Sequence, residues 1–276
     1  MNNINPFLRR CLLLLLLALM LASDSTGQRF EPRIVFASNR DGDWDIYSMD
    51  VNGDNPVRLT DHPADDRNPA CSPDGKKIAF DSERGLTSDL YAMDRDGNNV
   101  IRLTRDNFAE GRSSWSPDGK KIAFTSFCNK GNCDIFTVKA DGGNRTRLTE
   151  HEMQDVLPIW SPDGRKIAFQ SQRVFEGYDI YEITAEGKNL KQLTQGGNNR
   201  MPVYVRDGRK IAFVSTRDGD FNIYLMEANG RNAVKLTRTP PGIDNVKPSW
   251  LPGPLAVIPN EKLPISWGEL KRTGNP

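Results

Sequence analysis

The chain has 276 residues, of which 37 are basic and 36 acidic, so its formal net charge is +1. Proteins that bind nucleic acid or anionic membranes normally carry clustered positive charge, and the balanced composition argues against both classes. The length suits one or two domains, and a closed array of repeats would use all of it as one.

Residues 1–28 have the features of a secretory signal peptide. Arg9 and Arg10 precede an apolar run from Cys11 to Ala22, which is shorter than the roughly 20 residues that span a bilayer. Small residues for cleavage follow between Ser23 and Gly27. We therefore expect a periplasmic or secreted mature protein with no membrane span, and an uncleaved membrane anchor is the alternative.

Residues 29–252 are built from a repeated unit, and we expect them to form one domain. The unit is marked by Trp-Ser-Pro-Asp-Gly-Lys-Lys-Ile-Ala-Phe at Trp115–Phe124, and nearly unchanged at Trp160–Phe169. Its glycines are separated by 44, 45 and 44 residues, at Gly75, Gly119, Gly164 and Gly208. Ser-Pro-Asp-Gly suits a tight turn because Pro presets φ and Gly accepts left-handed backbone. The turn and the apolar alternation after it predict a β-hairpin.

Four short strands recur along the chain. One contains Ile-Ala-Phe or its equivalent, one begins with Asp-Ile-Tyr, one ends in Leu-Thr, and one ends in an aromatic residue or, once, in Cys71. Four short strands in about 44 residues are typical of a propeller blade. We therefore predict an all-β fold, a β-propeller of four-stranded antiparallel blades.

Arginines follow the Ile-Ala-Phe strand in most units, ahead of the Asp or Asn that opens the next strand. They are Arg40, Arg84, Arg173 and Arg217. We expect a charge-assisted hydrogen bond across each hairpin. In the third unit Cys128 takes this place, and a disulfide between Cys128 and Cys133 would replace the ion pair, with a metal site as the weaker reading. Cys71 is expected to be a small buried apolar residue.

These motifs resemble the TolB-type, WD40-like (PD40) β-propeller repeat family over about residues 33–250. The resemblance implies that the strand ending in Trp is innermost and the Leu-Thr strand outermost. Whole blades would then begin at Pro69, Ser113, Pro158 and Pro202. The segment Pro248–Trp250 would supply the inner strand of the blade that starts at Arg33. We expect five blades, closed by N- and C-terminal strands sharing one blade, with six blades as the alternative and residues 253–276 as a tail of unassigned role.

The loops from an outer strand to the next inner strand should crown one face of the ring, around the central channel. Polar residues lie three positions before each inner strand: Asp66, Glu110, Asp155, Asn199 and Asn245. Cations lie beside them, at Arg67, Arg112, Arg200 and Lys247, and both histidines, His62 and His151, occur in the same loops. We predict that these residues converge on the axis as a binding site. The alternative is that each polar residue caps its own loop.

The leading functional hypothesis is a non-catalytic, exported scaffold that binds a protein or peptide, such as a cell-envelope component, at this face. It is expected to be a monomer without cofactor or metal. Propeller-gated peptidases carry a hydrolase domain with a Gly-x-Ser-x-Gly motif, which the sequence lacks. The alternative is a propeller lyase or glycosidase that uses Asp66, Glu110 and Asp155 as paired carboxylates.

Overall fold

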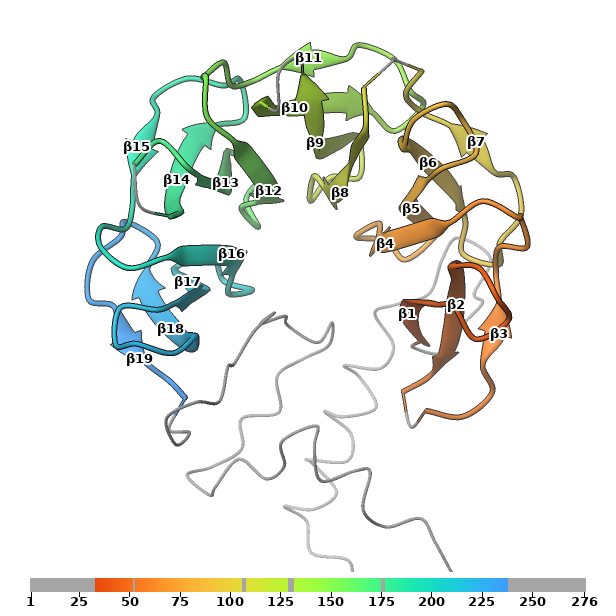
Figure 1. Ribbon diagram of the computed structural model, residues 1–276, viewed down its shortest axis with the longest axis horizontal. Helices are drawn as coiled ribbons and strands as arrows, with labels where there is room; N and C mark the ends of the chain where they lie inside the picture. Colours follow the sequence, from red (N-terminus) through yellow and green to blue (C-terminus); the bar gives the residue numbers. More distant parts are fainter. Residues whose placement is uncertain (1–32, 52, 106–107, 129–131, 175–176, 238–276) are drawn as a thin grey trace, which may run out of the picture.

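The computed structural model describes residues 33–51, 53–105, 108–128, 132–174 and 177–237. These residues form five antiparallel sheets arranged in sequence order around a common axis (Figure 1). The protein is an all-β, five-bladed propeller, as the sequence predicted. The signal peptide, the tail and the closing strand expected at Pro248–Trp250 lie outside the described residues, so these limits remain predictions.

Each blade is a meander in which sequence neighbours pair. Blade I contains β1 (Arg33–Ser38), β2 (Asp45–Asp50) and β3 (Val57–Arg58). Blade II contains β4 (Asp66–Cys71), β5 (Lys77–Ser82), β6 (Asp89–Asp94) and β7 (Ile101–Arg102). Blade III contains β8 (Glu110–Trp115), β9 (Lys121–Cys128), β10 (Asn132–Lys139) and β11 (Thr146–Arg147). Blade IV contains β12 (Asp155–Trp160), β13 (Lys166–Ser171), β14 (Asp179–Thr184) and β15 (Lys191–Gln192). Blade V contains β16 (Asn199–Tyr204), β17 (Lys210–Ser215), β18 (Asn222–Glu227) and β19 (Val234–Lys235).

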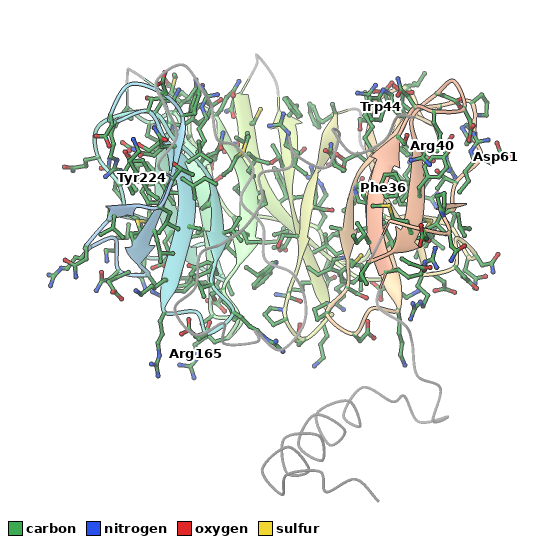
Figure 2. The ribbon with its side chains drawn as sticks, turned by 90° about the horizontal axis from the view of Figure 1, so that it is seen from below. Phe36, Arg40, Trp44, Asp61, Arg165 and Tyr224 are labelled. Carbon is green, nitrogen blue, oxygen red and sulfur yellow. The ribbon has the colours of Figure 1, made fainter. Side chains whose placement is uncertain are left out.

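The strands that end in Trp or its equivalents are innermost and the two-residue Leu-Thr strands outermost, as the family resemblance implied (Figure 1). The two ends of the ring are distinct. Figure 2 places Trp44 and Arg40 at one end and Arg165, which follows a Ser-Pro-Asp-Gly turn, at the other. We call the end with Trp44 the crown face, because the inner strands start there.

The hydrophobic core lies between blades, and this explains the Ile-Ala-Phe motif. Successive side chains of a strand point to opposite faces of the sheet. Ile78 and Phe80 pack against Ile46 of blade I, whereas Ala79 packs on the other side with Trp115 of blade III. The same division recurs at the next two blade interfaces. Blades II, III and IV therefore each bury one large and one small apolar face against their two neighbours.

The Leu-Thr motif ties the outer strand to the strand before it. In blade I the hydroxyl of Thr60 accepts the backbone N–H of Ile46 at 2.9 Å and donates to the carboxylate of Asp45 at 3.1 Å. The equivalent threonines accept the equivalent N–H groups in the other blades. A two-residue strand thus gains the anchoring that its short ladder cannot supply.

Close approach between blades explains the glycines after the third strand. Gly97 has φ +88°, and a Cβ at this position would lie 2.5 Å from the carbonyl oxygen of Leu59 in the preceding blade. Gly187 and Gly230 meet the equivalent leucine carbonyls in the same way. These glycines are therefore required by packing as well as by backbone conformation.

Candidate functional site

The structure buries four of the five polar residues that were predicted to converge on the axis. Asp66, Glu110, Asp155 and Asn199 are the first residues of the inner strands β4, β8, β12 and β16, and each is at most 2% exposed. The prediction that these side chains point into the channel is therefore wrong. The alternative that each residue caps its own loop agrees with Asn199, whose amide donates to the Gly196 carbonyl at 3.0 Å, whereas the three carboxylates are held by arginines. Asn245 and Lys247 lie outside the described residues.

Arginines of the same blade hold all four side chains, and in three blades the arginine lies in the loop between the second and third strands. Arg84 Nη2 lies 2.7 Å from Asp66 Oδ2, and Arg173 Nη2 lies 2.6 Å from Asp155 Oδ2. Arg217 donates to Asn199 Oδ1 at 2.9 Å in blade V. A charge-assisted hydrogen bond was expected across the hairpin that follows each Ile-Ala-Phe strand, but these arginines instead bond the first residue of the inner strand on the other side. The register explains the error, because Asp66 stands opposite Ser82 and Arg84 turns back towards it.

In blade III the arginine that holds the buried acid comes from a different segment of the chain. Arg145, which precedes the outer strand β11, donates to Glu110 Oε1 at 2.8 Å and to Ser126 Oγ at 2.9 Å. The ion pair is therefore kept, and the idea that a disulfide replaces it is wrong. The side chain of Cys128 lies outside the described part of the structure, so its bond to the buried Cys133 remains a prediction.

Arg67 and Arg200 occupy equivalent places on the crown face and stack on aromatic rings of the preceding blades. The guanidinium of Arg67 lies 4.7 Å from the ring centre of Trp44, and that of Arg200 lies 5.0 Å from the ring centre of Tyr178. Such cation–π contacts restrain long side chains at a surface. The two arginines therefore present ordered charges at the crown face.

The side chains of the two histidines accept hydrogen bonds within their own loops. Nδ1 of His62 accepts the backbone N–H of Ala64, and Nδ1 of His151 accepts that of Met153, both at 3.0 Å. These contacts are local turns of equivalent form in two separate blades. Among the described residues no group of three or more His, Cys, Asp or Glu side chains is placed to hold a metal ion.

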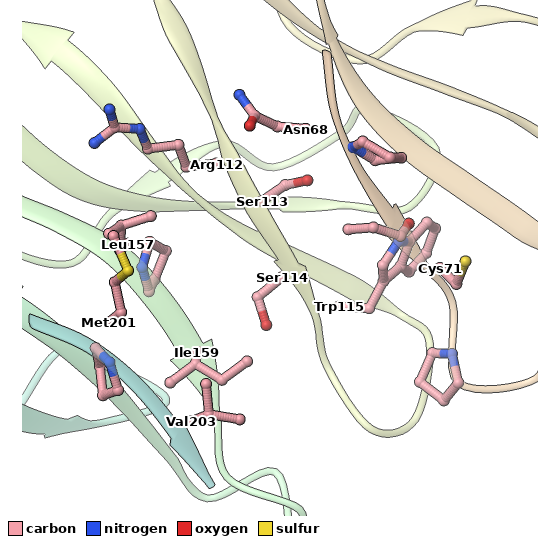
Figure 3. Close-up of a pocket in the computed structure, with 15 residues that line it drawn as sticks. Asn68, Cys71, Arg112, Ser113, Ser114, Trp115, Leu157, Ile159, Met201 and Val203 are labelled. Atoms are coloured by element: carbon pink, nitrogen blue, oxygen red, sulfur yellow. The ribbon is translucent and has the colours of Figure 1, made fainter. Parts of the chain in front are cut away.

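A cavity of about 590 Å³ opens among the inner strands of blades II to V (Figure 3). Its described lining is mainly apolar and includes Trp115, Ile159 and Val203. Arg112 is the one charged side chain among these lining residues. The part of the cavity wall that the structure describes is therefore mainly apolar and carries one cation.

A β-bulge in each inner strand shapes this wall. The strand pairing slips by one position in each, and the bulged residue has positive φ although it is not glycine. These residues are Asn68 (φ 51°), Arg112 (φ 58°), Leu157 (φ 57°) and Met201 (φ 52°). Left-handed backbone costs about 1–2 kcal/mol for most L-residues and is tolerated only where the surroundings impose it.

Side chains of the preceding blade impose this backbone. The carboxylate of Asp81 accepts the N–H of Arg112 at 3.1 Å, and Gln170 Oε1 accepts the N–H of Met201 at 3.0 Å. Thr125 Oγ1 does the same for Leu157 at 3.1 Å. Three of the four bulges are thus fixed by contacts between blades, whereas the Asn68 side chain bonds Asp81 within blade II at 2.7 Å.

Asp81 is a buried carboxyl group directly behind the cavity wall. Burial raises its pKa to about 7, although hydrogen bonds from the Asn68 amide and the Arg112 backbone oppose the shift. Gly111 makes room for it, since a Cβ there would lie 2.4 Å from Asp81 Oδ2. Sequence reasoning missed Asp81. Its only signal was a charged residue at the place held by Thr125 and Gln170 in other units.

The prediction for Cys71 is also wrong. Its side chain is exposed and lines the cavity, whereas the sequence analysis predicted it to be buried. The physical reason is size, because the Trp115 indole reaches across to donate to the Ala70 carbonyl at 3.0 Å and a thiol cannot span such a gap. The protein atoms around the thiol still raise its pKa by desolvation.

Among the described residues no helix is long and apolar enough to cross a membrane. Sequence comparison gives short matches with curated proteins. The chain is 48% identical over 56 residues to the "Protein TolB homolog" of Chlorobaculum tepidum, which covers 20% of this chain and 13% of that protein. It is 43% identical over 49 residues to the "Tol-Pal system protein TolB" of Syntrophotalea carbinolica, covering 18% and 11%. The matches therefore span only a small part of each relative.

Solved structures extend the similarity over most of the chain. TolB from Acinetobacter baumannii superposes with a TM-score of 0.64 at 26% identity, covering 77% of this chain and 54% of that protein. A putative TolB from Agrobacterium tumefaciens gives 0.63 at 25% identity, covering 74% and 79%. An oligogalacturonate lyase in complex with manganese gives 0.60 at 19% identity, covering 75% and 62%, which shows the shared fold alone.

The family model described as the TolB beta propeller domain matches residues 27–128 and 110–252. The two matches together cover the predicted repeat region, most of which lies in the five described blades. The chain belongs to the TolB β-propeller (PD40) family.

Proposed function

We propose that this protein is an exported, non-catalytic scaffold that binds a protein or peptide partner of the cell envelope in the channel at the ring's axis. The observation that carries the proposal is the cavity of about 590 Å³ among the inner strands. An apolar hollow with few convergent polar groups is the usual form of a recognition site. Family membership and the likeness to TolB structures support a partner of this kind.

The rigidity of the wall also supports binding. Its shape depends on backbone conformations that neighbouring blades hold in place, as at Leu157 and Met201. A preorganised wall loses little entropy when it receives a ligand. The protein acts as a monomer in this proposal, in the periplasm or outside the cell, and needs no cofactor.

The experiment begins with capture of a partner from an envelope extract and its purification. Titration calorimetry then compares the native chain with Leu157→Glu, which places a carboxylate in the apolar wall, and with Leu190→Glu. Leu190 is 47% exposed and does not line the cavity, so it is the matched control. Affinity lost only in Leu157→Glu supports the proposal, and equal affinity in all three proteins would refute binding in the channel.

One observation favours the enzymatic alternative. Asp81 lies beside the cavity with a pKa near neutrality, as a general base requires. The carboxylates first considered for this role, Asp66, Glu110 and Asp155, are instead paired with arginines. Turnover of pectate fragments or glycans that disappears in Asp81→Asn, with the fold intact, would establish catalysis in place of binding.

A further inference from the structure

Contacts from the preceding blade fix the backbone of Arg112, although its side chain is exposed. It adopts left-handed φ, both carboxylate oxygens of Asp81 lie 3.1 Å from its amide nitrogen, and Gly111 leaves the space that Asp81 occupies. Strained residues of this kind persist where the surroundings determine them, and they concentrate at functional sites. The blades therefore fix the point from which the Arg112 side chain leaves the wall.

The guanidinium of Arg112 has no hydrogen bond or ion pair with any described residue. It is exposed, and no acidic side chain is among the described residues that line the cavity. Asp81 bonds the backbone amide of Arg112 and not its guanidinium. Other arginines at this end of the ring are engaged, as Arg84 is by Asp66 and Arg145 by Glu110. The buried Asp81 carboxyl attracts the Arg112 charge from behind the wall but forms no ion pair with the guanidinium, so the hydrogen-bonding edge of this cation remains open to a ligand carboxylate.

Apolar side chains continue the wall from Arg112. Leu157 and Met201 take the equivalent bulge positions in the next two blades, and Ile159 and Val203 follow them along the same strands. Figure 3 shows Arg112, Leu157 and Met201 in succession along one side of the cavity. A ligand that covers this wall meets one positive charge next to a continuous apolar surface.

We propose that the polypeptide bound in the channel carries a carboxylate that pairs with Arg112, flanked by apolar residues that cover Leu157 and Met201. This inference rests on the proposed function, because it names the chemistry of the segment that the channel receives. A planar guanidinium binds a carboxylate through two parallel hydrogen bonds and so fixes orientation as well as charge. The carboxylate is either a side chain of Asp or Glu or the C-terminus of the segment.

The first test uses random dodecapeptides displayed on phage with free or blocked C-termini, selected on the full chain. The native protein should enrich an acidic residue, or a free C-terminus, next to Leu, Ile, Val or aromatic residues. Selection on Arg112→Gln should lose the acidic preference and keep the apolar one. An identical consensus on both proteins, or a native consensus without a carboxylate, would overturn the proposal.

The second test measures the affinity of the selected peptide and of its Glu→Gln or C-terminal amide form. Because a hydrogen bond between charged groups is lost, Arg112→Gln should weaken binding of the acidic peptide about 10- to 100-fold and leave the neutral peptide unchanged. Arg67→Gln is the matched control, since Arg67 is a crown-face arginine that does not line the cavity.

The outcomes separate this inference from the proposed function. If no peptide competes with the captured partner and Leu157→Glu leaves affinity intact, channel binding itself fails. If peptides bind in the channel but Arg112→Gln has no effect, binding stands and the role of Arg112 is refuted. Self-association that depends on Arg112 would identify a second copy of the chain as the occupant and would also overturn the proposal.

Discussion

The guanidinium of Arg145 lies 2.8 Å from Oε1 of Glu110 and 3.9 Å from the ring centre of Phe136, at a place where other blades use an arginine from a different loop. Glu110 is one methylene longer than Asp66 and Asp155, which fill the equivalent position. The longer acid and the relocated arginine together preserve a buried ion pair in blade III.

Removing this arginine should destabilise the protein strongly. Arg145→Ala leaves the Glu110 carboxylate buried without its cation, and loss of one partner of a buried pair costs about 3–5 kcal/mol. Chemical unfolding followed by tryptophan fluorescence measures the loss. Arg165→Ala at the opposite end of the ring is the control and should change stability little. Equal stability of the two variants would contradict the assigned role.

Substitution by alanine should cost more stability at Gly97 than at Gly119, although both glycines have left-handed φ. Gly97 and Gly119 have φ +88° and +69°, so alanine meets the strain of left-handed backbone at both, about 1–2 kcal/mol. Only at position 97 would the new methyl group collide with another blade, at 2.5 Å from the Leu59 carbonyl, whereas nothing lies within 4 Å at position 119. Thermal unfolding should show a clearly larger loss for Gly97→Ala. A loss no larger than that of Gly119→Ala would show that packing between blades tolerates the methyl group.

The protein should lose stability as Asp81 ionises. Its pKa in the folded state is about 7, above the value of 3.8 for an unperturbed aspartate, so the folded protein binds this proton more tightly than the unfolded chain. The stabilisation is complete below about pH 4 and is lost as the pH rises through about 7. Urea unfolding at about pH 5 and about pH 8 should show a smaller decline for Asp81→Asn than for the native chain. Identical declines would rule out Asp81 as the titrating group.

Cys71 should report occupancy of the channel. Its thiol is exposed in the cavity, but desolvation raises its pKa, so alkylation by iodoacetamide at neutral pH should be slower than for free cysteine and should accelerate at higher pH. A bound partner or selected peptide should protect the thiol. Cys71→Ser identifies the labelled site in mass spectra. Labelling that is indifferent to the ligand would place the ligand elsewhere.

The repeat pattern predicted the blades because the size of each side chain in the pattern follows from the packing between neighbouring blades. Ile78, Ala79 and Phe80 alternate in size since each side of the sheet meets a different neighbour, and such a pattern is visible in one sequence. The turn at Gly75 is equally local, and the structure confirms its positive φ. Strand order inside a blade followed from the resemblance to known repeats.

The site was predicted less well because its determinants are not local. Asp66 looked like a channel-facing residue from its loop position, but pairing with Arg84 across the β4–β5 hairpin draws it inside. Arg112 and Leu157 carry no residue-type signal for left-handed backbone, which a side chain from another blade imposes. Of the four bulge residues only Asn68 has the propensity that sequence reasoning could have used.

The hydrophobic clusters between neighbouring sheets determine how the ring unfolds. Phe124 of blade III is buried partly by Leu90 and Leu103 of blade II, so an isolated sheet would expose much of its apolar surface and each sheet depends on the adjoining ones. Cutting the chain at a Ser-Pro-Asp-Gly turn breaks one covalent link between two strands of a blade but leaves the described contacts between blades intact. Joining the ends and reopening the chain at such a turn should therefore give a circularly permuted ring with the same wall around its axis.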